Sequence, residues 1–142
     1  MAIYGYQGTL QKNRWRGVLQ GPNLRATLGI GYAGGNAGAG GTVTQATDKS
    51  TGVTLNTPNG LITMNGAALA ADAVVSFTLT NDKIHDTDFI MLQHDSAGTV
   101  GAYILSAQPA EGSAVINVAN RTTGSLSEAI VIRFMRFAGA SS

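Results

Sequence analysis

Apolar and polar residues alternate one by one along much of the chain after residue 41. In Val74–Thr80 the side chains of Val75, Phe77 and Leu79 fall on one face, and the polar side chains fall on the other. A period of two residues is typical of a β-strand, because successive side chains of a strand point to opposite faces. From this pattern and from β-branched content we expect eight strands, at Thr42–Thr47, Gly52–Asn56, Leu61–Asn65, Val74–Thr80, Phe89–His94, Val100–Ala107, Ala114–Asn120 and Ile130–Phe137.

Turn-forming residues separate most of these strands. The motifs TPNG, SAGT, PAEG and RTTG are rich in proline, asparagine, serine and glycine, which favour tight turns through a fixed φ, local hydrogen bonds and access to positive φ. TPNG at residues 57–60 predicts a hairpin between the second and third strands. Only residues 66–72 and 81–86 leave room for a helical turn.

Eight short strands with turns between them predict an all-β fold. We expect an eight-stranded antiparallel sandwich of jelly-roll type, with two four-stranded sheets packed face to face and an extended N-terminal arm. An immunoglobulin-like sandwich is the alternative, although the chain lacks the Cys–Trp–Cys pattern. The very apolar strand at residues 130–137 belongs either at the centre of a sheet, which we favour, or at an edge that a partner covers.

Charge divides the chain near residue 42. Residues 1–41 hold four of the nine basic residues and no acidic residue, whereas residues 42–142 hold five basic and all eight acidic residues. Only 12% of the residues are charged and 44% are apolar, which excludes a disordered polyelectrolyte and argues against a histone-like nucleic-acid binder. We therefore expect two parts, a glycine-rich basic and aromatic arm at residues 1–41 and a β-sandwich body at residues 42–142.

The arm combines cations and large rings with a flexible glycine tract at residues 34–41. Aromatic rings beside arginines are typical anchors of protein-binding surfaces, and a flexible tract would let them reach a neighbouring protein. The alternative is that the rings fold back onto the core of the body. The candidate partner-binding residues are Tyr4, Tyr6, Lys12, Arg14, Trp15, Arg16, Arg25 and Tyr32.

The sequence offers little for catalysis or metal binding. Residues 29–34 match GxGxxG, but the glycine-rich stretch after them cannot open the helix that a dinucleotide site needs. His85 and His94 have aspartates nearby, yet adjacent strand residues point to opposite faces, which disfavours a shared metal ion. The absence of cysteine excludes a disulfide scaffold, a cysteine-ligated zinc site and a cysteine nucleophile. We therefore expect no enzyme activity, no cofactor and no metal.

Nucleic acid and membranes are not expected partners. Four cations with interleaved rings form at most a weak single-strand-binding pattern, and the acidic body would repel a polyanion. No apolar stretch is long enough to span a membrane, and the first residues show no secretion signal. These features predict a soluble protein that is made and assembled inside a cell.

Three motifs after residue 42 carry a family resemblance, namely VTQATDKSTGVTLN, GLITMNGAALA and GSLSEAIVI. The stretch resembles a β-domain of the head-decoration (cement) proteins of tailed bacteriophages. The resemblance implies a jelly-roll structural protein on the outer surface of the virion, where it reinforces contacts between major capsid protein subunits. It also implies two kinds of partner, the major capsid protein and further copies of the same chain, in a homodimer or homotrimer.

A similar β-domain occurs in phage fibres. The alternative function is therefore a head-fibre, tail-fibre or baseplate module that recognises a receptor on the host surface. Receptor fibres usually carry long repetitive shafts, which this chain lacks. A small enzyme or a lectin is a third possibility.

Overall fold

The structure, a computed structural model, describes residues 38–139. Of the predicted arm at residues 1–41, it describes only the last four residues.

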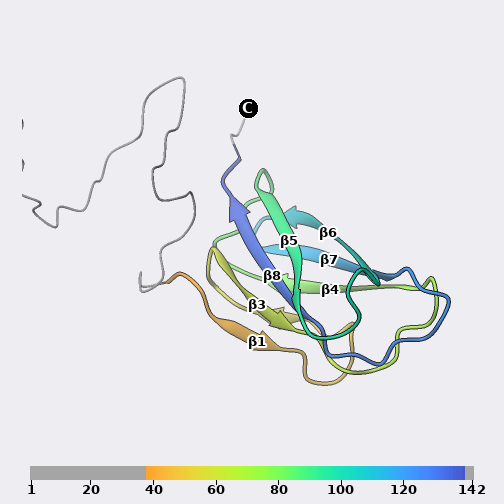
Figure 1. Cartoon of the computed structure of the whole chain (residues 1–142). Helices are drawn as coiled ribbons and strands as arrows, with labels where there is room; N and C mark the ends of the chain where they lie inside the picture. The colour runs from red at the N-terminus through yellow and green to blue at the C-terminus, as the bar shows by residue number, and fades with distance from the viewer. Residues whose placement is uncertain (1–37, 140–142) are drawn as a thin grey trace, which may run out of the picture. The chain divides into compact units, whose positions relative to one another are not determined.

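Eight strands and no helix make up the described part of the chain (Figure 1). The strands are β1 (Thr42–Thr44), β2 (Val53–Thr54), β3 (Asn59–Thr63), β4 (Val74–Thr80), β5 (Phe89–Ser96), β6 (Tyr103–Ala110), β7 (Ser113–Asn120) and β8 (Val131–Phe137). The predicted all-β fold is confirmed, and β4 has the predicted bounds. β6 begins three residues later than predicted, because Ala97, Gly98 and Gly101 adopt positive φ and carry the chain through a loop first.

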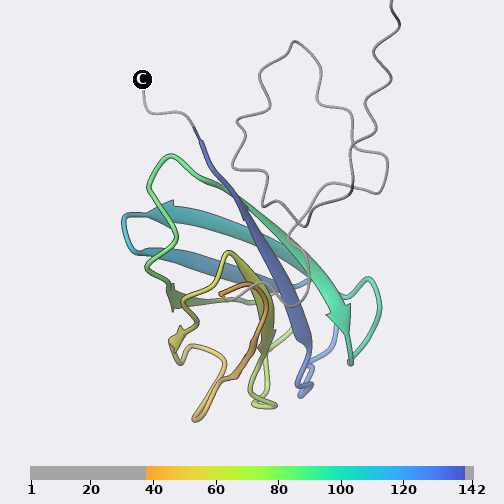
Figure 2. The ribbon, with the colours of Figure 1, turned by 90° about the vertical axis from the view of Figure 1, so that its left-hand side faces the viewer.

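The strands form two four-stranded sheets in a sandwich-like arrangement (Figure 2). Sheet A has the order β1-β3-β8-β5 and sheet B the order β2-β4-β7-β6. The prediction of a wholly antiparallel sandwich is wrong, because β1 runs parallel to β3 and β2 runs parallel to β4. The physical reason is that β1 to β4 lie alternately in sheet A and sheet B. The chain reverses its direction at each crossing, so after two crossings it returns to the same sheet in the original direction. The other four pairs are antiparallel.

The motif TPNG does not form the predicted hairpin. β2 pairs with β4 in sheet B, whereas β3 pairs with β8 in sheet A. The Leu55 amide still donates to the Thr80 carbonyl of sheet B at 3.1 Å, and the Pro58 carbonyl already accepts from the Arg136 amide of sheet A at 2.9 Å. Residues 55–58 therefore carry the chain from one sheet to the other. Turn residues mark where the chain bends, but they do not determine which strands pair.

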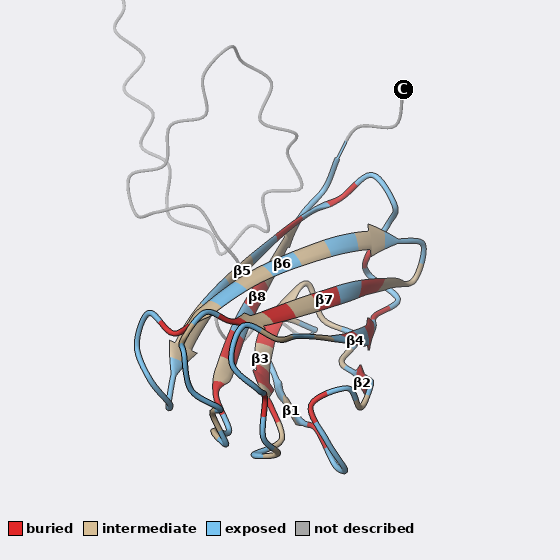
Figure 3. Ribbon diagram, turned by 90° about the vertical axis from the view of Figure 1, so that its right-hand side faces the viewer, coloured by how far each residue is buried: buried red, intermediate tan, exposed pale blue. Residues whose placement is uncertain are grey.

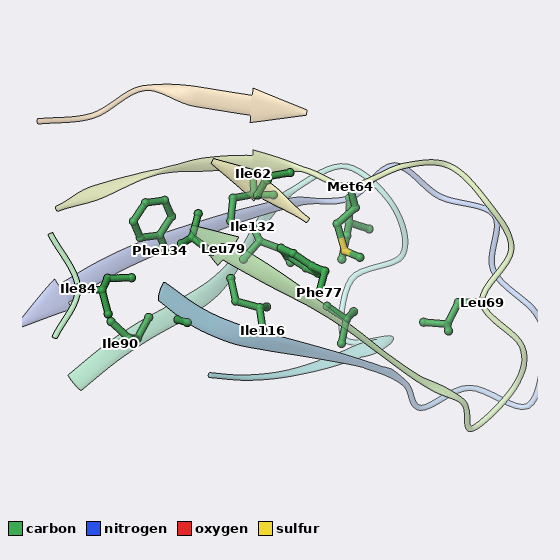
Figure 4. Close-up of a cluster of buried hydrophobic side chains, with 14 residues drawn as sticks. Ile62, Met64, Leu69, Phe77, Leu79, Ile84, Ile90, Ile116, Ile132 and Phe134 are labelled. Carbon is green, nitrogen blue, oxygen red and sulfur yellow. The ribbon is translucent and has the colours of Figure 1, made fainter. Parts of the chain in front are cut away.

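The core lies between the two sheets and follows the predicted alternation of apolar positions (Figure 3). Ile132 and Phe134 of β8 are fully buried and face Phe77, Leu79 and Ile116 of sheet B within one cluster (Figure 4). β8 lies between β3 and β5, which confirms the preferred central position for this strand. A sandwich of this kind holds its outer faces and loops on a rigid support.

Buried amide side chains fix the loops at one end of the sandwich. Asn120 is fully buried, and its Nδ2 donates to the carbonyls of Leu69, Ala70 and Gly124 at 2.8–3.0 Å. The Nε2 of buried Gln45 donates to the carbonyls of residues 49 and 51. Because buried polar groups are costly when unpaired, these bonds hold the loops in defined positions.

Candidate functional site

The eight candidate residues of the arm, Tyr4 to Tyr32, all lie outside the described residues. The described part of the body presents two outer sheet faces and the loops between strands.

The outer face of sheet B has an unusual composition. β4, β7 and β6 each direct every second side chain outward, and we call the surface that they form the neutral face. Its members are Val74, Ser76, Thr78, Thr80, Ser113, Val115, Asn117, Ala119, Ile104, Ser106, Gln108 and Ala110. None of the four strands of sheet B contains a charged residue on either face. A surface usually carries many charges, whereas the core of a protein interface is depleted of them.

Hydrogen bonds order the middle of the neutral face. Ser76, Asn117 and Ser106 lie side by side across the three strands. The Ser76 hydroxyl donates to Asn117 Oδ1 at 2.6 Å, and Asn117 Nδ2 donates to Ser106 Oγ at 3.3 Å. In the next row, Val74 and Ile104 flank the small Ala119 and are 61% and 59% exposed. The neutral face therefore presents ordered polar groups beside exposed aliphatic ones.

The outer face of sheet A has an apolar cluster at one end, which we call the apolar corner. It consists of Phe89 and Met91 on β5 and Met135 and Phe137 on β8, paired by register. Phe89 is 62% exposed and Met91 is 49% exposed. The rings of Phe89 and Phe137 have centroids 6.4 Å apart in a tilted arrangement. Exposed apolar clusters of this kind often mark sites of protein contact.

Glu128 holds the loop between β5 and β6. Its carboxylate accepts hydrogen bonds from the amide and hydroxyl of Thr99, at 2.9 and 2.6 Å, and from the Tyr103 hydroxyl at 2.7 Å. The bonds from Thr99 hold the pKa of Glu128 below its usual value. Burial of the phenol and its bond to Glu128 raise the pKa of Tyr103. This anchored loop carries Val100, which is 94% exposed.

The histidines make separate contacts. His85 Nδ1 lies 3.1 Å from a carboxylate oxygen of Glu111, and His94 Nε2 donates to the Ala97 carbonyl at 2.6 Å. Among residues 38–139 no group of three or more histidine, aspartate and glutamate side chains could hold a metal ion.

A polar hollow of about 300 Å³ lies beside His85, Glu111 and Arg136. Arg136 Nε is 2.9 Å from the carboxylate of Asp88, whose side chain is 1% exposed. The same carboxylate accepts from the amides of His85 and Gly139. Because these donors occupy the Asp88 carboxylate, its evident role is to join the end of β8 to the loop before β5.

Comparisons with protein-family models, with curated proteins and with solved structures found no match for this chain. In the described residues, no helix has the length and hydropathy needed to cross a membrane. Within residues 38–139 the neutral face spans three strands, whereas the apolar corner spans two.

Proposed function

We propose that this protein is a cement (head-decoration) protein of a tailed bacteriophage. It binds the outside of the capsid and reinforces contacts between major capsid protein subunits. The resemblance of residues 42–137 to such proteins supports the proposal, and so does the β-sandwich body, since a protein that acts by adhesion needs a rigid support.

The neutral face is the observation that carries the proposal. Burial of a broad sheet face without charges costs little free energy, because no ion has to be removed from water. Its three strands, β4, β7 and β6, cover about 25 by 14 Å, from the usual rise per residue and strand spacing. This area is smaller than the roughly 800 Å² per partner of a stable complex. One copy therefore binds weakly through this face alone, and further contacts must add to it.

The mechanism is thermodynamic linkage. A protein that binds the assembled shell, but not its separated subunits, stabilises the shell by mass action. A copy or an oligomer that touches two capsid subunits makes the second contact intramolecular, which raises its effective concentration. Many weak contacts then stabilise the shell together.

In this proposal the arm supplies the further contacts. Trp15 with Tyr4 and Tyr6 provides apolar anchors, and the arginines of the arm pair with carboxylates of the capsid. These residues lie outside the described part of the chain, so their role rests on the sequence.

The jelly-roll assignment belongs to the same proposal. Eight strands divided equally between two sheets support it, as does the alternation of β1 to β4 between the sheets. The two parallel pairs are a departure from the usual all-antiparallel form of that fold.

The proposal can be tested with virus particles assembled without this chain, to which the purified full-length protein is added back. We expect near-stoichiometric binding to the major capsid protein and greater resistance of the particles to heat. We expect Thr78→Glu, in the neutral face, to weaken binding about 10-fold or more, because a charge would have to be desolvated. Thr44→Glu, at an exposed threonine on the outer face of sheet A, is the matched control.

Two results would count against the proposal. Particles without the protein that survive heating as well as complete particles would exclude a cement role. A few copies at the tail or the vertices would favour the receptor-binding alternative.

A further inference from the structure

One edge of sheet A differs from the other sheet edges. The edge strands are β1 and β5 in sheet A and β2 and β6 in sheet B. β1 and β2 have three and two residues, and β6 contains Pro109, which has no amide hydrogen to donate. β5 has eight residues and no proline. In the described part of the chain β5 pairs only with β8, so it has the long free edge that invites another strand.

The backbone groups that face this edge follow from the register. The Arg136 amide donates to Pro58, on the side of β3, so the backbone of Arg136 faces away from β5. Ile90 lies opposite Arg136, and Leu92 lies opposite Phe134, two residues along. In an antiparallel pair the residues alternate between bonding to the partner and pointing away from it. The N–H and C=O groups of Ile90 and Leu92 therefore point to the free edge.

The apolar corner lies along the same edge. Phe89 and Met91 of β5 are both about half exposed or more on the outer face. β5 contains one charged residue, Asp95, and Arg133 Nε of the same subunit donates to its carboxylate at 2.6 Å. Two such edges can therefore meet without bringing like charges together, and each would cover apolar surface of the other.

We propose that β5 pairs antiparallel with β5 of a second copy of the chain and forms a two-fold dimer. In the register that satisfies both edges, Ile90 lies opposite Leu92 of the partner subunit and exchanges two hydrogen bonds with it. The two Met91 side chains then meet on the outer face, and the two copies of sheet A become one continuous sheet. When β5 pairs with β5 of a second copy, neither copy has this edge left for a third. The assembly is therefore a dimer and not a trimer.

This inference stands on the sheet edge and does not depend on the capsid proposal. Its test is the mass of the full-length protein in solution, by light scattering or sedimentation, at concentrations on the order of 10 μM. We expect twice the chain mass of 14.6 kDa. We also expect slow hydrogen exchange at the Ile90 and Leu92 amides, although among residues 38–139 of its own subunit neither amide has a strand to bond to.

Two variants make the test specific. We expect Met91→Lys to weaken the dimer about 100-fold or more, because it places like charges together at the two-fold axis. The matched control is Thr44→Lys, on the outer face of the same sheet at the opposite edge, which should remain a dimer.

A monomer or a trimer of the unaltered protein would overturn the proposal. A dimer with fast exchange at both amides, or one that Met91→Lys leaves intact, would place the contact elsewhere and overturn it too. So would a dimer that Thr44→Lys weakens as much as Met91→Lys does.

Discussion

Individual charged side chains hold the loops that the strand pattern leaves undefined. Glu128 bonds to Thr99 and Tyr103, and it thereby joins the β5–β6 loop to the segment before β8. The ammonium group of Lys49, which is 4% exposed, donates to the carbonyls of Asn65 and Glu128 at 2.6 and 2.5 Å. Burial lowers the pKa of Lys49, since a charge is costly away from water. Neither pairing follows from local sequence.

The Glu128 contact predicts a pH dependence of stability. Its pKa lies below the ordinary value of 4.5 in the folded protein, so its contribution is complete above that value and is lost as the pH falls through the lowered pKa. We expect Glu128→Gln to melt at a lower temperature than the unaltered protein at neutral pH, and the difference to shrink towards about pH 3. Calorimetry across this range measures it, with Asp86→Asn, at an exposed aspartate, as the control. A difference that stays constant with pH would contradict the prediction.

Among the elements, the β6–β7 hairpin is the one that local sequence describes best. Glu111 and Gly112 alone connect the two strands, where the PAEG motif predicts a turn. Gly112 has a φ of 73°, a conformation that side chains with a Cβ atom rarely adopt. A Cβ atom added there would meet nothing within 4 Å, so only the backbone conformation requires glycine.

Gly112→Ala should therefore lower the free energy of unfolding by about 1 kcal/mol, from backbone strain alone. Gly66→Ala is the matched control, because Gly66 also has open space around it and no positive φ. There we expect no loss, or a small gain through the unfolded state. Urea denaturation of both variants measures the two effects, and equal losses would show that the strain argument fails.

On the scale of the whole molecule, charge separates the arm from the body. Residues 1–41 carry a net charge of +4 and residues 42–142 a net charge of −3, which together give the total of +1. The described body contains one apolar core to which both sheets contribute. It therefore has the parts that a domain needs to fold without the first residues.

Deletion of residues 1–30 is expected to leave a folded body that binds capsid particles much more weakly. Circular dichroism and thermal melting check the fold, and sedimentation with particles checks the binding. If arginines of the arm pair with capsid carboxylates, binding of the full chain should also weaken as salt rises. An unfolded deletion product would show that the arm belongs to the core.

Sequence alone predicted the strands well and their partners poorly. Alternation located β4 to its exact residues and all eight strands approximately, because it reports which faces are buried. Pairing depends on contacts between distant segments, as between β3 and β8, and the motif TPNG at residues 57–60 misled for that reason. The sequence shows that the segments of β4, β6 and β7 contain no charged residue. Only the sheet order shows that these strands lie side by side and form one face.

The central place of β8 has a consequence for synthesis. β3 and β5 are both bonded to β8, and they emerge from the ribosome before it. β3 cannot complete its pairing in sheet A until the chain has been made through Met135, and β5 cannot until it has been made through Phe137. Until then the nascent chain exposes strands of sheet A without their central partner, and unpaired strand edges of this kind favour association between chains during synthesis.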